Sequence, residues 1–248
     1  MKQLHEYIKE SFFDAEDNSD ISKHIKDEIK QFLKDNYTGA AKCKISKTPN
    51  EDGRYVVDSK YKVGVKNKNI TNLTNDLFVW GEVAGDFDCD SCTSLKTLEG
   101  SPEKVGGSFI CGCCKKITSL EGAPKEVGRS FWCNECSSLK SLEGAPEKVG
   151  MHFSCYRCYM LPSLKGSPKE VGGSFSCEKC NSLTSLEGSP EKVGMNFSCE
   201  ECDSLTSLKG APKEVGGSFR CILCAKITSL EGAPKKVRGD FYCDRRLR

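Results

Sequence analysis

The sequence predicts a mainly β repeat solenoid with one short strand in each 22-residue coil, preceded by a small α-helical arm and a β cap. Three observations predict this fold class. Phenylalanine recurs every 22 residues from Phe87 to Phe241, and cysteines recur in the same register. Gly-Gly and E-G-x-P turn segments separate the apolar stretches. A unit this short cannot bury its own apolar side chains, so successive units must stack on one another.

The repeat unit is clearest at residues 175–196, which read FSCEKCNSLTSLEGSPEKVGMN. The alternating F-x-C segment indicates a strand of period two, and E-G-x-P indicates a turn. No helical period fits inside a unit, so we expect an extended return on the other side of each coil. Seven full repeats, a truncated eighth and a basic C-terminal end occupy residues 87–248.

The two residues after each repeat proline alternate in charge from unit to unit. If the coils stack in register, unlike charges lie ~5 Å apart on adjacent coils, which stabilises that register. A charged binding face is the alternative interpretation. One such column consists of Glu103, Lys125, Glu147, Lys169, Glu191 and Lys213.

Residues 41–86 are predicted to form the β cap, including a degenerate first repeat. Strands are expected at 43–46, 54–59 and 61–65, with a hairpin turn at 50–53 between the first two. The degenerate repeat has a longer connecting loop, which carries Phe78 and Trp80.

Residues 1–40 are predicted to form the helical arm. Ile21, Ile25, Ile29 and Leu33 follow helical spacing, and Ser19 or Asp20 supplies the N-cap. A first short helix is expected from Lys2 to Phe13.

The repeat resembles the leucine-rich repeat, whose core phrase is similar to F-x-C-x-x-C-x-x-L at Phe175, Cys177, Cys180 and Leu183. The continuation through L-E-G-x-P-x-x-V is similar to the short bacterial class of these repeats, and the whole unit looks like repeat proteins of large tailed bacteriophages. The resemblance covers roughly residues 63–243 and departs in using Phe and Cys where Leu dominates. It implies inward-facing Phe and Cys, and a phage-type protein in the cytoplasm of a bacterial host.

The first ten residues, MKQLHEYIKE, resemble the capsid-targeting peptide of internal head proteins in T-even-like phages. The resemblance implies cleavage between Glu10 and Ser11 and a structural role in the virion interior. An ordinary amphipathic helix start is the alternative. The matching positions are Met1, Lys2, Glu6, Tyr7, Ile8 and Glu10.

Fifteen of the 17 cysteines fall in two columns, and Cys43 and Cys113 stand outside them. Because the N-terminus lacks the apolar stretch of a signal peptide, we expect reduced thiols. A buried thiol core without a cofactor is the favoured interpretation, since Cys packs as a small hydrophobe and the truncated repeat has Arg246 in the second column. Zinc or another soft metal held by stacked C-x-x-C pairs is one alternative, and disulfides are another. The ligands of the metal alternative would be Cys89, Cys92, Cys111, Cys114, Cys133, Cys136, Cys155, Cys158, Cys177, Cys180, Cys199, Cys202, Cys221 and Cys224.

Composition excludes several classes of function. With 37 basic and 35 acidic residues, the chain does not attract nucleic acid by bulk charge. No run of ~18 apolar residues spans a membrane. The three histidines are too scattered for a nucleophilic triad, and no phosphate-binding loop is present, so we expect no enzyme activity.

The variable positions lie on the predicted strands, beside the constant Phe and Cys. Alternation points them outward, onto the sheet face that solenoids use for binding. Drift of solvated residues is the alternative. We expect a protein partner of undetermined identity to bind this face, where aromatic residues and arginine are typical of interface hot spots. The candidate binding residues are Trp132, His152, Tyr156, Arg157, Tyr159, Arg220 and Tyr242.

Overall fold

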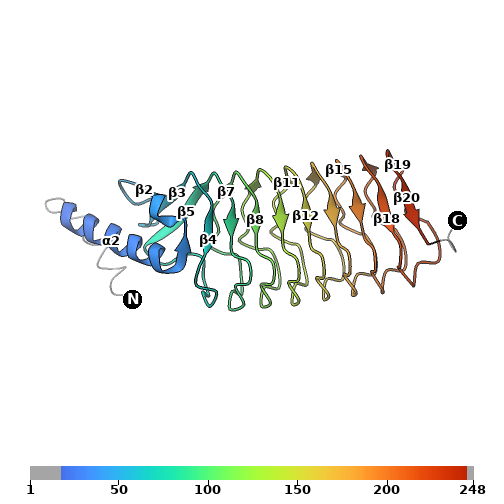
Figure 1. The fold of residues 1–248 in the computed structure, drawn as a ribbon, viewed down its shortest axis with the longest axis horizontal. Coiled ribbons are helices and arrows are strands. Elements are labelled where there is room, and N and C mark those ends of the chain that lie inside the picture. Colours follow the sequence, from blue (N-terminus) through green and yellow to red (C-terminus); the bar gives the residue numbers. More distant parts are fainter. Residues whose placement is uncertain (1–17, 245–248) are drawn as a thin grey trace.

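The computed structural model describes residues 18–244, and it confirms the mainly β solenoid with an N-terminal helix. The coils stack along the long axis of the molecule, and the helix lies at one end (Figure 1). The helix predicted from Lys2 to Phe13, the peptide at residues 1–10 and Arg246 lie outside the described residues. No helix in residues 18–244 is long and apolar enough to cross a bilayer.

Helix α2 (Asn18–Asn36) begins the described chain, and its Ile25, Ile29 and Leu33 are buried, as the helical spacing predicts. The chain then forms β1 (Tyr37–Thr38), a 3-10 turn (Ala40–Lys42), β2 (Lys44–Ile45), β3 (Tyr55–Ser59), β4 (Val63–Val65) and β5 (Phe78–Val83). Strands β2 and β3 pair antiparallel across the predicted hairpin.

The segment carrying Phe78 and Trp80 is strand β5 and not the expected connecting loop. It pairs in parallel with β3, and both aromatic side chains are buried. Trp80 also donates its indole N–H to the Leu73 carbonyl oxygen at 2.9 Å. Burial of these two rings against the cap explains why the segment is extended.

Each coil contributes two strands and not one, because the predicted extended return also pairs with its neighbours. The predicted strands, from β6 (Phe87–Asp88) to β20 (Phe241–Cys243), join β4 and β1 in one ten-stranded sheet, here called sheet A. The returns, from β7 (Lys104–Val105) to β19 (Lys236–Val237), join β5, β3 and β2 in a second ten-stranded sheet, sheet B.

The strands between these ends repeat at the same register in every coil. In sheet A they are β8 (Phe109–Ile110), β10 (Phe131–Trp132), β12 (Phe153–Ser154), β14 (Phe175–Ser176), β16 (Phe197–Ser198) and β18 (Phe219–Cys221). In sheet B they are β9 (Glu126–Val127), β11 (Lys148–Val149), β13 (Glu170–Val171), β15 (Lys192–Val193) and β17 (Glu214–Val215).

The core is a continuous stack of phenylalanine rings between the two sheets. Phe153, Phe175 and Phe197 pair at the same register, with ring centroids 5.2 Å apart at each step. The rings are fully buried, and both cysteine columns point inward beside them. This arrangement confirms that the coils stack directly on one another.

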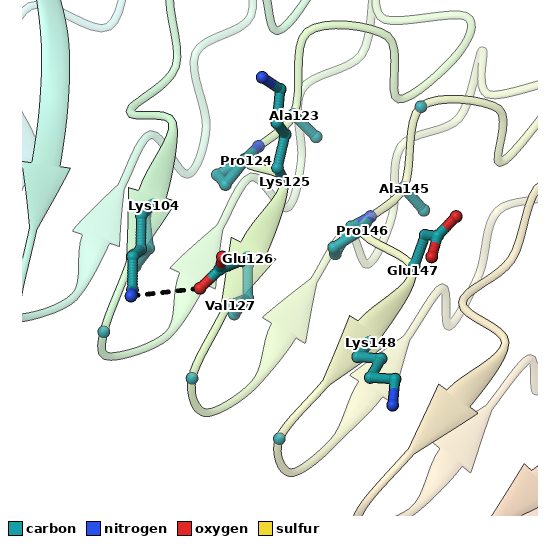
Figure 2. Close-up of a pocket in the computed structure, with 15 residues that line it drawn as sticks. Lys104, Ala123, Pro124, Lys125, Glu126, Val127, Ala145, Pro146, Glu147 and Lys148 are labelled. Carbon is teal, nitrogen blue, oxygen red and sulfur yellow. Dashed lines mark ion pairs between the residues drawn. The ribbon is translucent and has the colours of Figure 1, made fainter.

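The charge columns on the outside of sheet B confirm the predicted register. Unlike charges on adjacent coils form ion pairs, as Figure 2 shows for Lys104 and Glu126 at 3.2 Å. These side chains are exposed, so each pair contributes only about 0–1 kcal/mol. The pairs of the first column are Glu103–Lys125, Glu147–Lys169 and Glu191–Lys213, at 2.9, 3.0 and 3.1 Å.

Candidate binding face

The candidate site is the outer side of sheet A, here called the strand face. It is formed by the residue after each repeat Phe, the residue after the first-column Cys, and the turn residue that follows. These turn residues adopt positive φ although none is glycine, for example Arg157 at 58° and Lys179 at 57°. The left-handed turn directs their side chains onto the strand face while the next cysteine returns to the core.

Four candidate residues form two contacting pairs on adjacent coils. The Trp132 and His152 rings are 6.0 Å apart between centroids, and the Arg157 guanidinium lies 5.0 Å from the centre of the Tyr156 ring. Tyr159 lies in the following loop and is 44% exposed. We call Trp132, His152, Tyr156, Arg157 and Tyr159 the aromatic cluster. It is a half-buried apolar surface with a cation at its edge.

Arg220 and Tyr242 form a separate pair farther along the strand face. Strands β12, β14 and β16 lie between them and Trp132 in the order of sheet A. Arg220 lies over the Tyr242 ring at 4.7 Å and donates from Nε to the Glu200 carboxylate at 2.7 Å. The Tyr242 hydroxyl donates to Asp240 at 2.9 Å. The structure therefore does not bring this pair into the aromatic cluster, and its polar groups already have partners.

His152 also belongs to a side-chain ladder that the sequence interpretation missed. In successive coils the residue before Phe accepts a hydrogen bond from the backbone N–H of its counterpart on the next coil. His152 Nδ1 accepts from Ser174 N at 3.0 Å, as Asn196 Oδ1 accepts from Ser218 N at 2.9 Å. The signal was present in the sequence, because this column holds only Asp, Ser, His and Asn: Asp86, Ser108, Ser130, His152, Ser174, Asn196, Ser218 and Asp240.

The second cysteine column forms a ladder of thiol donors. Cys136 Sγ donates to the Cys111 carbonyl oxygen at 3.2 Å, and Cys180 Sγ donates to the Cys155 carbonyl oxygen at 3.2 Å. The same contact recurs at Cys114, Cys158, Cys202 and Cys224. These bonds require protonated thiols.

Burial favours the protonated form of first-column thiols, whereas side-chain hydrogen bonds to Cys89 and Cys199 lower the pKa of Cys114 and Cys224 in the second column. Loss of solvation, reinforced by neighbouring thiols, raises the pKa of Cys111 and of Cys133 well above the ordinary value of 9.0. The cysteines of the described chain form no disulfide bonds with one another. Within residues 18–244 no three Cys, His, Asp or Glu side chains are grouped so that they could hold a metal ion. The second cysteine column therefore offers hydrogen-bond donors to the backbone.

A groove of about 800 Å³ lies on the sheet B side and not on the strand face. Figure 2 shows its lining of repeat prolines, valines and the alternating lysines and glutamates. The same residue types recur coil after coil, so this groove is a property of the framework.

Comparison with known proteins identifies no relative. No protein-family model matches the chain, and no curated protein or solved structure matches it either.

Proposed function

We propose that this protein is a non-enzymatic interaction module that binds a protein partner through the strand face. The observation that carries the proposal is the aromatic cluster. It combines the Trp132–His152 ring pair with the Tyr156–Arg157 pair in the turn after β12, whereas three strands of the same face carry serine next to the buried Phe. Trp, Tyr and Arg are the residue types that contribute most binding energy in protein interfaces.

The rigid framework supports this function. Main-chain pairing in two sheets and the continuous ring stack fix the spacing of the cluster, so little conformational entropy is lost on binding. Sheet B, in contrast, carries solvated charges that alternate in sign from coil to coil. The resemblance of the repeat to leucine-rich repeats also favours the strand face as the binding surface.

Affinity capture from bacterial host lysate tests the proposal. The wild-type chain is compared with a Trp132→Ala, Tyr156→Ala double variant and with Tyr61→Ala as a matched control. Tyr61 is 52% exposed on the cap, just before β4, and β6 and β8 lie between β4 and the strand of Trp132 in sheet A. We expect the double variant to lose the captured protein by at least tenfold and the control to retain it. Equal capture by all three would remove the aromatic cluster from the binding site.

The phage-type and virion-interior interpretations are separate proposals. The first rests on the resemblance of the repeat and of residues 1–10, and the second rests on residues 1–10 alone. Mass spectrometry of mature particles tests them. A chain that begins at Ser11 would support them, and an intact N-terminus in those particles would contradict the cleavage.

A further inference from the structure

Two like charges are adjacent on the strand face. Arg157 and Lys179 occupy the same turn position on neighbouring coils, and Arg157 N donates to the Glu178 carbonyl oxygen at 2.9 Å. Their backbones are therefore one coil spacing, ~5 Å, apart. On sheet B, the lysine and glutamate side chains at equivalent positions of neighbouring coils alternate in charge through most of the array. A like-charged pair opposes stacking, so register control does not explain it.

Each cation is paired on its far side only. Arg157 Nη1 lies 3.4 Å from Glu135 Oε1, and Lys179 Nζ lies 3.2 Å from Glu201 Oε2. Four successive coils carry Glu135, Arg157, Lys179 and Glu201 at this turn position, so the two glutamates lie on the outer coils and the two cations on the inner ones. Arg157 and Lys179 are neighbours on the inner two coils, and no ion pair joins either of them to the nearby Glu178 in the described chain.

Arg157 also carries a donor without a partner. Its Nε is buried and makes no hydrogen bond, and the other such side-chain atom within residues 18–244 is Ser198 Oγ on the same face. Buried donors in folded proteins almost always have a hydrogen-bond partner, so the unpaired Nε points to a ligand that supplies an acceptor. Tyr156, and to a smaller extent Tyr159, raise the pKa of Arg157, which places both phenol groups close to the guanidinium.

We propose that Arg157 and Lys179 bind a carboxylate of the partner, an acidic side chain that enters beside the aromatic cluster. Rotation of Arg157 away from Glu135 would present its Nε–Nη2 edge as a fork for one carboxylate, and Lys179 would supply a second charge. The proposal rests on the proposed function and adds the chemistry of the partner: an apolar anchor for Trp132 and Tyr156 with an acidic residue next to it.

The test uses the full chain and two small probes that differ in charge alone. N-acetylglutamate amide carries the carboxylate, and N-acetylglutamine amide is its neutral counterpart. Each is titrated at constant ionic strength while the Arg157 Nε–H resonance is followed by NMR. We expect a saturable shift with the carboxylate only, weakened at least threefold by Lys179→Gln. Glu178→Gln removes a nearby negative charge and should strengthen the carboxylate's binding.

Several results would overturn the assignment. Equal shifts with both probes would exclude recognition of charge, and an unchanged affinity in Lys179→Gln would exclude the paired cations. Tighter binding of inorganic phosphate than of the carboxylate would assign the pair to a phosphorylated partner instead. These titrations need no natural partner, so their failure is distinguishable from a failure of the capture experiment with Trp132→Ala, Tyr156→Ala.

Discussion

Cys136 Sγ donates a hydrogen bond to the Cys111 carbonyl oxygen at 3.2 Å, so a side chain of one coil satisfies the backbone of the coil before it. Both residues are fully buried, and no water reaches that carbonyl group. The repeated cysteine is therefore selected by hydrogen bonding as well as by volume: it is small enough for the core and supplies one donor.

Replacing Cys136 by valine removes the donor and adds some volume to the core. We expect the free energy of unfolding to fall by about 1–3 kcal/mol, because the Cys111 carbonyl is left buried and unpaired. Cys136→Ser retains a donor and is the matched control. Urea denaturation of both variants measures the difference. A valine variant as stable as the wild type would show that the thiol hydrogen bond contributes nothing.

Truncation of a phenylalanine should destabilise the fold most in the middle of the ring stack. Phe175→Ala removes a fully buried ring between two neighbours at 5.2 Å, so we expect a loss of about 3–5 kcal/mol. Phe241 stacks on one described neighbour, Phe219, and is only partly buried. Phe241→Ala should therefore cost clearly less in the same denaturation experiment. Equal losses at the two positions would contradict the described stack.

The fold should lose stability in alkali. Burial raises the pKa of Cys92 and of Cys221 to about 12, from an ordinary value of 9.0. Unfolded thiols thus ionise before folded ones, which favours the unfolded state as pH rises. The free energy of unfolding should hold below pH 9 and fall between pH 9 and 12.

The control for the alkaline loss is a Cys92→Ala, Cys221→Ala variant. It lacks two of the titrating groups, so its stability should fall less steeply over the same range. Identical slopes for variant and wild type, measured by chemical denaturation at each pH, would assign the alkaline loss to other groups.

His152 should be replaceable by an acceptor but not by an apolar residue. His152→Leu removes the acceptor of the Ser174 N–H, and we expect a loss of about 1 kcal/mol. His152→Asn should be nearly neutral, since Asn196 accepts the equivalent hydrogen bond two coils on. Thermal unfolding compares the two variants. If both melt at the same temperature, the side-chain ladder does not contribute to stability.

Much of the fold could be predicted because equivalent positions of successive repeats have the same surroundings. The positions of Phe175 and Cys180 recur in every unit, so one burial pattern predicts them all. The second strand could not be predicted, because a two-residue strand such as Lys104–Val105 leaves no alternation to detect. This strand forms because its backbone pairs in parallel with the equivalent segment of the neighbouring coil, Glu126–Val127.

The candidate site was predictable in part. Spacing close to one repeat places Trp132, His152 and Tyr156 on adjacent coils. The direction of Arg157 was not predictable, since it depends on a left-handed turn at a position that carries no glycine. The separation of Arg220 from the aromatic cluster follows from counting repeats, but its pairing with Glu200 required the side-chain geometry.

Hydroxyl-radical footprinting of the captured complex tests the central claim most directly, because it reads which side chains the partner covers. Trp132, Tyr156, Tyr159 and Met160 should lose reactivity on binding, while Tyr61 on the cap should keep it. Tyr159 and Met160 are 44% and 46% exposed in the free chain, so their protection is measurable. Unchanged reactivity at these four positions, with protection appearing elsewhere, would show that the partner does not bind the strand face.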